Sequence, residues 1–398
     1  MKQKGLLTIF LIVFIDLIGF GLILPLLPFI AEKFDATPFE IGMLAAAYSF
    51  FQFISAPIMG RLSDRFGRKK LLFISQIGSA IGFIFLGVTN TLPLIFLSRI
   101  IDGITGGNIS IAQAYIADIT TPQNRAKGMG MLGAAFGLGF IFGPAIGGFL
   151  SQWGFAVPAY FAAVISGLAA ISTWFFLEET VDTQTAKTKK QAQFSFENLK
   201  NTLATPVLGL LIGVFFLINL AFSGMQGTFA LWTQATYGWG PVQTGYMFAY
   251  IGIMSVIMQL FILPRAIKAF GEKSVFKLSL PMLALGLLGV PLSIHWGLLL
   301  IATGFLVLGN SLANPTIQSI ASENVNKEEY GGTLGFLQSA ASLGRIVGPL
   351  MAGQLFAAVS KDAPYIFSAM VILIALLIVQ KYLPTDSIFQ KLRLRFFS

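Results

Sequence analysis

The sequence predicts an all-α membrane protein whose twelve helices form two pseudo-symmetric bundles of six. Three observations lead to this prediction: the chain is 55% hydrophobic, only 11% of its 398 residues are charged, and its long apolar segments alternate with short polar ones. About 25% of residues are charged in an average soluble domain, so a soluble chain of this length could not cover its surface. The forty-two glycines agree with this class, because glycine is more frequent in membrane helices than in soluble ones.

Twelve segments are apolar enough to be candidate spans, for which about 18 apolar residues are needed. They lie near 5–30, 39–60, 71–89, 92–116, 127–150, 156–177, 206–233, 241–264, 274–293, 297–320, 329–358 and 362–383. The one long polar segment follows the sixth of them. It predicts a first six-helix bundle at 1–178, a cytoplasmic linker at 179–205, and a second six-helix bundle with a short basic cytoplasmic tail at 206–398.

The basic residues fix the expected orientation of these spans. With both termini in the cytoplasm, 22 of the 26 Lys and Arg residues lie in cytoplasmic segments, whereas Lys33 and Lys361 lie outside and Arg99 and Arg345 lie within spans. This asymmetry is what the positive-inside rule requires. It accounts for the net charge of +9 without a nucleic-acid partner.

Several function classes are excluded by what the sequence lacks. There is no cysteine and only one histidine, His295, so thiolate sites and multi-histidine metal sites are excluded, and we expect neither a metal nor a cofactor. His295 is expected to be an interfacial ring beside Trp296. No P-loop sequence is present, which excludes an ATP-driven pump, and we expect no enzyme activity.

An internal repeat relates the two predicted bundles. Gly143-Pro144 recurs 205 residues later as Gly348-Pro349, and Gly139 recurs in the same register. Small residues at four-residue spacing let helices approach closely, so these positions are predicted to be packing surfaces and hinges. Duplicated halves around a central cavity are typical of transporters, with the substrate site near the bilayer midplane.

A basic loop, GRLSDRFGRKK, begins at Gly60 between the second and third predicted spans. Gly60 and Gly67 permit a tight turn and a close approach of helices. Asp64 lies within reach of Arg65 and Arg68. Two interpretations remain open: a charged latch that breaks when helices rock apart, or a topological anchor in which Asp64 only neutralises local charge.

Three charged residues are predicted to lie inside the membrane in the first bundle. Asp16 lies about 16 Å into the first span at 1.5 Å per residue, near the midplane. An ionised carboxylate is costly at that depth, which favours proton uptake and suits a proton carrier. Arg99 and Asp102 are three residues apart, so they share a helix face and can pair. A permanently hydrogen-bonded Asp16 and an inert ion pair remain alternatives.

Polar side chains at helical spacing are candidates for the substrate-binding surface, with hydrogen bonds between helices as the alternative. The candidates are Gln52, Gln113, Asn219, Gln226, Asn310, Asn314, Gln318 and Arg345. Arg345 is the charge expected within a span of the second bundle. It could bind an anionic or polar substrate group, or pair with an acid of the first bundle.

Several motifs resemble the major facilitator superfamily. The loop at Gly60 is similar to its signature between spans 2 and 3, and Leu97-Ser98-Arg99-x-x-x-Gly103 to its span 4 motif. The glycine series from Gly133 to Gly148, with Gly143-Pro144, resembles the span 5 motif of its proton-driven antiporters. The segment starting at Asp16 resembles span 1 of drug/proton antiporters, and the segment from Gly103 to Asp118 the tetracycline/proton antiporters. The resemblance implies alternating access and proton-coupled export across the bacterial inner membrane by a monomer.

The chain departs from the tetracycline exporters at three positions. Those proteins carry an acid in span 3 where Gly82 stands here, a histidine in span 8 where Ser255 stands, and an acid in span 9. No Asp or Glu lies between Glu272 and Glu323. We therefore expect Asp102 to take over part of the proton coupling.

These observations favour a proton-coupled antiporter that exports small amphipathic organic compounds, of a tetracycline-like or multidrug kind. Its partners are a small-molecule substrate, protons and the lipid bilayer. The alternative is a transporter of a specific polar metabolite, such as a sugar or carboxylate, by symport or uniport. A membrane scaffold or receptor is a third possibility, but no appended domain or long loop is present to bind its partners.

Overall fold

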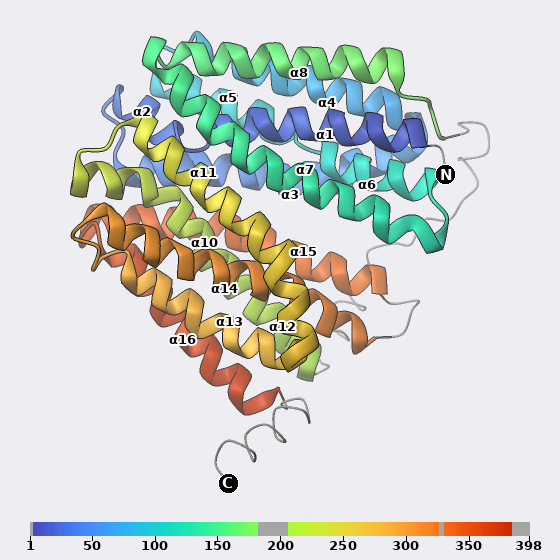
Figure 1. Cartoon of the computed structure of the whole chain (residues 1–398). Coiled ribbons are helices and arrows are strands. Elements are labelled where there is room, and N and C mark those ends of the chain that lie inside the picture. Colours follow the sequence, from blue (N-terminus) through green and yellow to red (C-terminus); the bar gives the residue numbers. More distant parts are fainter. Residues whose placement is uncertain (1–2, 182–205, 326–329, 384–398) are drawn as a thin grey trace. The chain divides into compact units, whose positions relative to one another are not determined.

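The computed structural model describes residues 3–181, 206–325 and 330–383, which form helices and no strand (Figure 1). The first part of the chain forms α1 Gln3–Ile23, α2 Leu27–Glu32, α3 Pro38–Phe66, α4 Arg68–Gly87, α5 Leu92–Thr105, α6 Asn108–Ile119, α7 Pro122–Leu150, η1 Ser151–Trp153 and α8 Ala156–Phe176. The second part forms α10 Pro206–Tyr237, α11 Pro241–Ile257, η3 Met258–Ile262, α12 Leu263–Phe270, α13 Glu272–Gly289, α14 Trp296–Glu323, α15 Tyr330–Ala358 and α16 Ala363–Tyr382.

The chain divides into two compact units. The first comprises Met1–Gln191 with Thr233–Gly252, and the second comprises Ala192–Trp232 with Ile253–Ser398. The predicted linker lies outside the described residues from 182 to 205, and the predicted basic tail lies outside them from 384 onward. The predicted division into 1–178, 179–205 and 206–398 therefore stays a prediction.

Ten helical segments of the described chain are long and apolar enough to cross a membrane. The other two predicted spans coincide with α13 and α15, which are helical but less apolar. Helix α13 begins with charged residues, Glu272, Lys273 and Lys277, and α15 is rich in Gly, Ser and Gln and contains Arg345. Both helices bear polar groups that a lipid-facing span would avoid.

Two predicted spans are interrupted. The first was expected to run to residue 30, but α1 ends at Ile23 and α2 begins at Leu27. Pro25 lies between them and has no N–H to continue the helix, which is the physical reason for the break. The fourth span breaks between α5 and α6, where Gly106 and Gly107 form a turn.

Each unit contains a pair of helices that pack backbone to backbone through glycine. In the first unit α7 lies against α1, and a methyl group on Gly143 would come 2.8 Å from the carbonyl carbon of Gly21. In the second unit α15 lies against α10 in the same way, and a methyl group on Gly348 would collide with the carbonyl oxygen of Leu220. The two Gly-Pro repeats thus occupy equivalent contacts within their own units.

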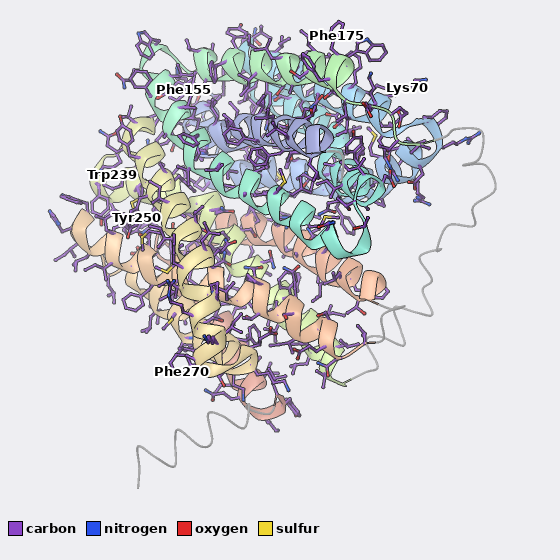
Figure 2. All side chains as sticks on the ribbon, turned by 45° about the vertical axis from the view of Figure 1, so that its right-hand side comes forward. Lys70, Phe155, Phe175, Trp239, Tyr250 and Phe270 are labelled. Carbon is purple, nitrogen blue, oxygen red and sulfur yellow. The ribbon has the colours of Figure 1, made fainter. Side chains whose placement is uncertain are left out.

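Large apolar side chains cover the outer surface of the helices. On α8 the side chain of Phe175 is 73% exposed and points outward (Figure 2). Trp174 and Phe176 beside it are also exposed. A soluble monomer seldom exposes a contiguous apolar patch of this kind, whereas lipid tails would cover it. This surface agrees with the multi-pass membrane class.

Candidate functional site

A buried ion pair lies on α5 in the first unit. An Nη atom of Arg99 lies 3.3 Å from the carboxylate of Asp102, and both side chains are about 95% buried. Arg99 also donates to the Ser98 hydroxyl at 3.0 Å and lies over the Phe83 ring. Ser79 on α4 donates to Asp102. Because each ion has a counter-charge and hydrogen bonds, the pair can remain charged away from water.

Asp16 lies on α1 and accepts a hydrogen bond from the side-chain amide of Asn108. Asn108 is the first residue of α6, directly after the glycine turn, and is buried. Asp102 is close enough to Asp16 for the two carboxylates to interact electrostatically. The described residues therefore place two acids near each other, and one of them, Asp102, is paired with Arg99.

Arg99 retains one donor for which the described part of the chain offers no acceptor. Its Nε atom is buried and makes no hydrogen bond there. A buried unpaired donor costs free energy, so it favours the arrival of another acceptor such as a carboxylate or water.

Gly82 on α4 lies next to Asp102 and leaves room for its side chain. A methyl group there would lie 3.2 Å from Cβ of Asp102 and 3.2 Å from the carbonyl oxygen of Ser98. A side chain at position 82 would therefore press against α5 and require a small shift there. The acid that the resemblance leads one to expect at position 82 would occupy the space that Asp102 fills here.

Gln52 connects α3 to the turn between α5 and α6. Its side-chain amide donates to the carbonyl of Gly106 at 3.2 Å and to the Tyr48 hydroxyl at 2.9 Å. The predicted candidate Gln52 thus lies next to the turn that positions Asn108. In this structure the Gln52 amide is therefore bonded to groups of the protein itself.

The loop between α3 and α4 forms a second charged group, here named the Arg68 cluster: Asp64, Arg68, Asp118 and Glu179. Arg68 is 92–93% buried, pairs with Asp64 one turn earlier on the chain, and donates from Nε to Asp118 on α6 at 3.0 Å. Arg68 also donates to the Ser63 hydroxyl at 2.6 Å. The cluster therefore ties the end of α3 to the end of α6.

Glu179 completes this cluster, and its role was not predicted from the sequence. Its carboxylate accepts the backbone N–H of Arg68 at 2.8 Å and that of Lys69 at 3.2 Å, so it caps the start of α4. A carboxylate at a helix N-terminus satisfies unpaired donors and complements the helix dipole. Gly67 has φ +101° and a methyl group there would collide with this carboxylate. Arg65, which was also expected within reach of Asp64, is exposed and lies over the Phe66 ring.

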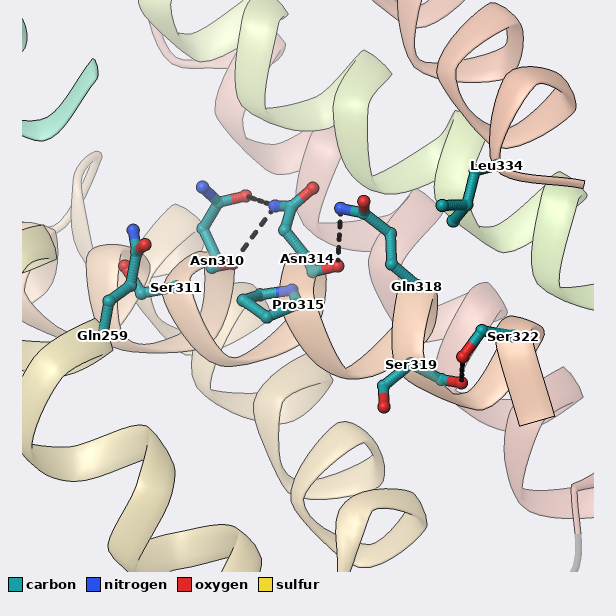
Figure 3. Close-up of a pocket in the computed structure, with 9 residues that line it drawn as sticks. All are labelled: Gln259, Asn310, Ser311, Asn314, Pro315, Gln318, Ser319, Ser322 and Leu334. Atoms are coloured by element: carbon teal, nitrogen blue, oxygen red, sulfur yellow. Dashed lines mark hydrogen bonds between the residues drawn. The ribbon is translucent and has the colours of Figure 1, made fainter. Parts of the chain in front are cut away.

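A cavity of about 590 Å³ lies within the second unit (Figure 3). Its walls come from η3, α14 and α15. Nine residues line it: Gln259, Asn310, Ser311, Asn314, Pro315, Gln318, Ser319, Ser322 and Leu334. Seven of the nine are polar, and none carries a charge. The volume falls in the usual range of about 300–1,000 Å³ for small-molecule sites.

The structure brings three predicted substrate residues together in this cavity. Asn314 donates to the side-chain oxygen of Asn310 at 2.8 Å, and Gln318 donates to the carbonyl of Asn314 at 3.1 Å. Gln259 and Ser311 were not predicted as lining residues. They meet through Ser255, whose hydroxyl is 3.1 Å from both the Ser311 hydroxyl and the Gln259 amide.

Besides Gln52, four other predicted substrate residues do not line this cavity. Gln113 on α6 is exposed, and Gln226 on α10 is half-buried. Asn219 donates to the carbonyl of Phe215 in its own helix at 2.9 Å. Arg345 donates to the Ser342 hydroxyl one turn earlier at 2.9 Å.

Within the described chain, no three His, Cys, Asp or Glu side chains come together in a way that could hold a metal ion. His295 accepts the backbone N–H of Gly297 through Nδ1 at 3.1 Å and so caps the start of α14. Its ring lies against Trp296.

Two helical units with apolar surfaces, buried intramembrane charges in the first and a polar cavity in the second define a multi-pass membrane protein of the transporter class. The family model for the Major Facilitator Superfamily matches residues 9–266 and 256–393. The chain therefore belongs to this superfamily of membrane transporters.

Characterised relatives extend over most of the chain. The class C tetracycline resistance protein of Escherichia coli is 30% identical over 362 residues, covering 90% of this chain and 91% of the relative. The class E protein from the same species is 32% identical, covering 87% of this chain and 86% of the relative. Multidrug resistance protein 2 of Bacillus subtilis is 30% identical, covering 93% and 94%.

Solved structures show the same fold. A human organic anion transporter superposes with a TM-score of 0.72 at 23% identity, covering 95% of this chain and 99% of the other. A nucleoside transporter superposes with a TM-score of 0.78 at 15% identity, covering 97% and 100%. At these identities the likeness concerns the fold alone.

Proposed function

We propose that this protein is a proton-coupled antiporter that exports small amphipathic organic compounds by alternating access. It lies in a bacterial inner membrane as a monomer with both termini in the cytoplasm. The observation that carries this proposal is the contact of Asp16 with Asn108 beside the Asp102–Arg99 pair. The named relatives, which are tetracycline and multidrug resistance proteins, support the substrate class.

Asp16 is the proton carrier in this proposal. In its ionised form it accepts the amide of Asn108 and repels the carboxylate of Asp102. Protonation removes that repulsion and leaves only one oxygen as a good acceptor, which loosens the contact between α1 and α6. The buried Nε of Arg99 makes no hydrogen bond within the described chain, so it remains available to another acceptor. Each entering proton supplies about 2.3 kcal/mol per 100 mV of membrane potential.

The Arg68 cluster is the gate in this proposal. It joins α3, α4 and α6 through charges that lie partly out of water, so the contacts are directional and are lost together when the helices separate. Helix α6 carries both Asn108 at its start and Asp118 at its end. A movement of α6 on protonation of Asp16 would therefore reach the gate through one rigid helix.

The test uses proteoliposomes with a pH-sensitive dye inside and tetracycline or chloramphenicol as the added compound. Asp16→Asn should lower substrate-driven proton flux about 100-fold or more, the scale of losing one positioned proton-transfer group. Asp35→Asn is the matched control because Asp35 is exposed and has φ +55°, a conformation that asparagine adopts readily. Unchanged flux in Asp16→Asn would refute the assignment of Asp16. Wild-type protein that moves no protons with either compound would refute proton-coupled export of such compounds.

A further inference from the structure

The cavity of the second unit has hydrogen-bonding capacity left over after its internal bonds are made. Both hydrogens of the Asn314 amide are used, one by the Asn310 side chain and one by its carbonyl, at 2.8 and 3.1 Å. Among the described residues, no partner is found for the Asn310 amide, for the side-chain oxygen of Asn314 or for that of Gln318. The cavity therefore offers at least one donor group and two acceptors to a ligand.

An irregular helix brings Gln259 into this cavity. Residues Met258–Ile262 form a π-helical turn, η3, between α11 and α12, and the N–H of Leu263 bonds to the carbonyl of Met258. Pro264 follows directly and has no N–H for the carbonyl of Leu260, so a widened turn avoids the clash that a regular helix would suffer. Single π turns occur frequently at functional sites. Gln259 lies within this one and faces the amides of α14 (Figure 3).

The absence of charge among the lining residues restricts the ligand. A cation bound against these residues would gain no carboxylate, and an anion would gain no guanidinium or ammonium group, so the lining supplies a counter-charge to neither. Amide and hydroxyl side chains instead match hydroxyl, carbonyl and carboxamide groups, which need one donor and one acceptor side by side. Pro315 and Leu334 supply apolar contact for a carbon skeleton.

We propose that this cavity binds the neutral part of the exported compound, a portion rich in hydroxyl, carbonyl or carboxamide groups, and that Gln259, Asn310 and Asn314 determine this preference. The inference rests on the proposed function, since it names the substrate class of the same transporter. It assigns recognition to a site within the second unit, apart from the charged residues of the first.

Binding to the purified full-length protein in lipid nanodiscs, without any proton gradient, tests the proposal. The two probes are chloramphenicol, which is neutral and carries hydroxyl and amide groups, and ethidium, a permanent cation, with empty nanodiscs to correct for partition into lipid. Wild-type protein should bind chloramphenicol at least about tenfold more tightly than ethidium. Asn314→Asp places a carboxylate in the cavity with almost no change in shape, and the preference should shift toward ethidium by at least about tenfold, or 1.4 kcal/mol.

Asn324→Asp is the matched control, because it makes the same chemical change on an exposed side chain at the end of α14, outside the cavity. It should leave the preference unchanged. The proposal is overturned if wild-type protein prefers ethidium, if it binds neither probe, or if Asn314→Asp shifts the preference no more than Asn324→Asp does. The outcome is separate from that of the proposed function: a neutral preference without proton flux refutes only proton coupling, whereas proton flux with a cationic preference refutes only this inference.

Discussion

The two units hold different kinds of polar group. The first buries ions, namely Arg99 with Asp102 and Arg68 with its carboxylates. The cavity of the second is lined by amides and hydroxyls. Repeated helix packing at Gly143 and Gly348 shows that this contrast arises on equivalent scaffolds. A duplicated fold can thus hold charge-changing groups in one copy and neutral recognition groups in the other.

The physical reason for such a division lies in the requirements of the two tasks. Coupling to protons needs a group whose charge changes. Burial strengthens the electrostatic interaction of that charge with neighbouring groups. Recognition of varied organic compounds is hindered by a fixed buried charge, because every compound without the opposite charge would leave it unpaired. Separation of the two tasks lets the substrate range change without loss of the coupling residues.

The largest change in the free energy of unfolding is expected at the Arg99–Asp102 pair, and it tests the contrast between the two units. Asp102→Asn leaves a buried guanidinium without its counter-charge and should lower the free energy of unfolding by about 3–5 kcal/mol. The double variant Arg99→Met with Asp102→Leu should lose less than Asp102→Asn alone, because no unpaired ion remains. Chemical denaturation in detergent, followed by the fluorescence of the tryptophans, measures both.

If Asp102→Asn lowered the free energy of unfolding by less than about 1 kcal/mol, the level typical of surface ion pairs, Asp102 would not be the only counter-charge available to Arg99. It would mean that Asp16 reaches Arg99 once Asp102 is neutral. Asp16→Asn added to Asp102→Asn should then restore the full loss. The contrast between the units would in that case rest on a shared charge network rather than on one pair.

An intermediate effect is expected at the Arg68 cluster. Gly67 and Gly154 have φ +101° and +112°, so alanine strains the backbone at both positions. No atom lies within 4 Å of a methyl group at Gly154, whereas at Gly67 the methyl group displaces Glu179 from the start of α4. Gly67→Ala should therefore lower the free energy of unfolding by about 1 kcal/mol more than Gly154→Ala, the usual contribution of a helix cap. Equal losses in thermal or chemical denaturation would show that the contact of Glu179 with the start of α4 does not contribute to stability.

Contacts between residues close in the sequence could be predicted. The spacing of Arg99 and Asp102 predicts a pair on one helix face, and Asp64 was expected to lie within reach of Arg68. The structure contains both pairs, the second across the break between α3 and α4. Helical periodicity also predicted the stripe from Asn310 to Gln318. The same reasoning predicted a continuous first span, which Pro25 interrupts.

Contacts between distant segments could not be predicted from these patterns. Asn108 meets Asp16 across 92 residues, and Glu179 meets Arg68 across 111. Periodicity says which face of a helix is buried but not which helix covers it. The π turn that brings Gln259 into the cavity was missed because one added residue barely alters an apolar pattern. Pro264 was its one signal, since a proline within a span calls for a local change of helix geometry.

The smallest change in the free energy of unfolding is expected in the cavity of the second unit. It tests the same contrast through uncharged groups. Asn314→Leu removes uncharged hydrogen bonds from a half-buried side chain and leaves no ion unpaired. The free energy of unfolding should change by about 1 kcal/mol or less, the net contribution of one neutral hydrogen bond. The same denaturation assay measures it beside Asp102→Asn. A loss of about 3 kcal/mol or more would show that the hydrogen bonds of Asn314 with Asn310 stabilise the second unit as strongly as the Arg99–Asp102 pair stabilises the first.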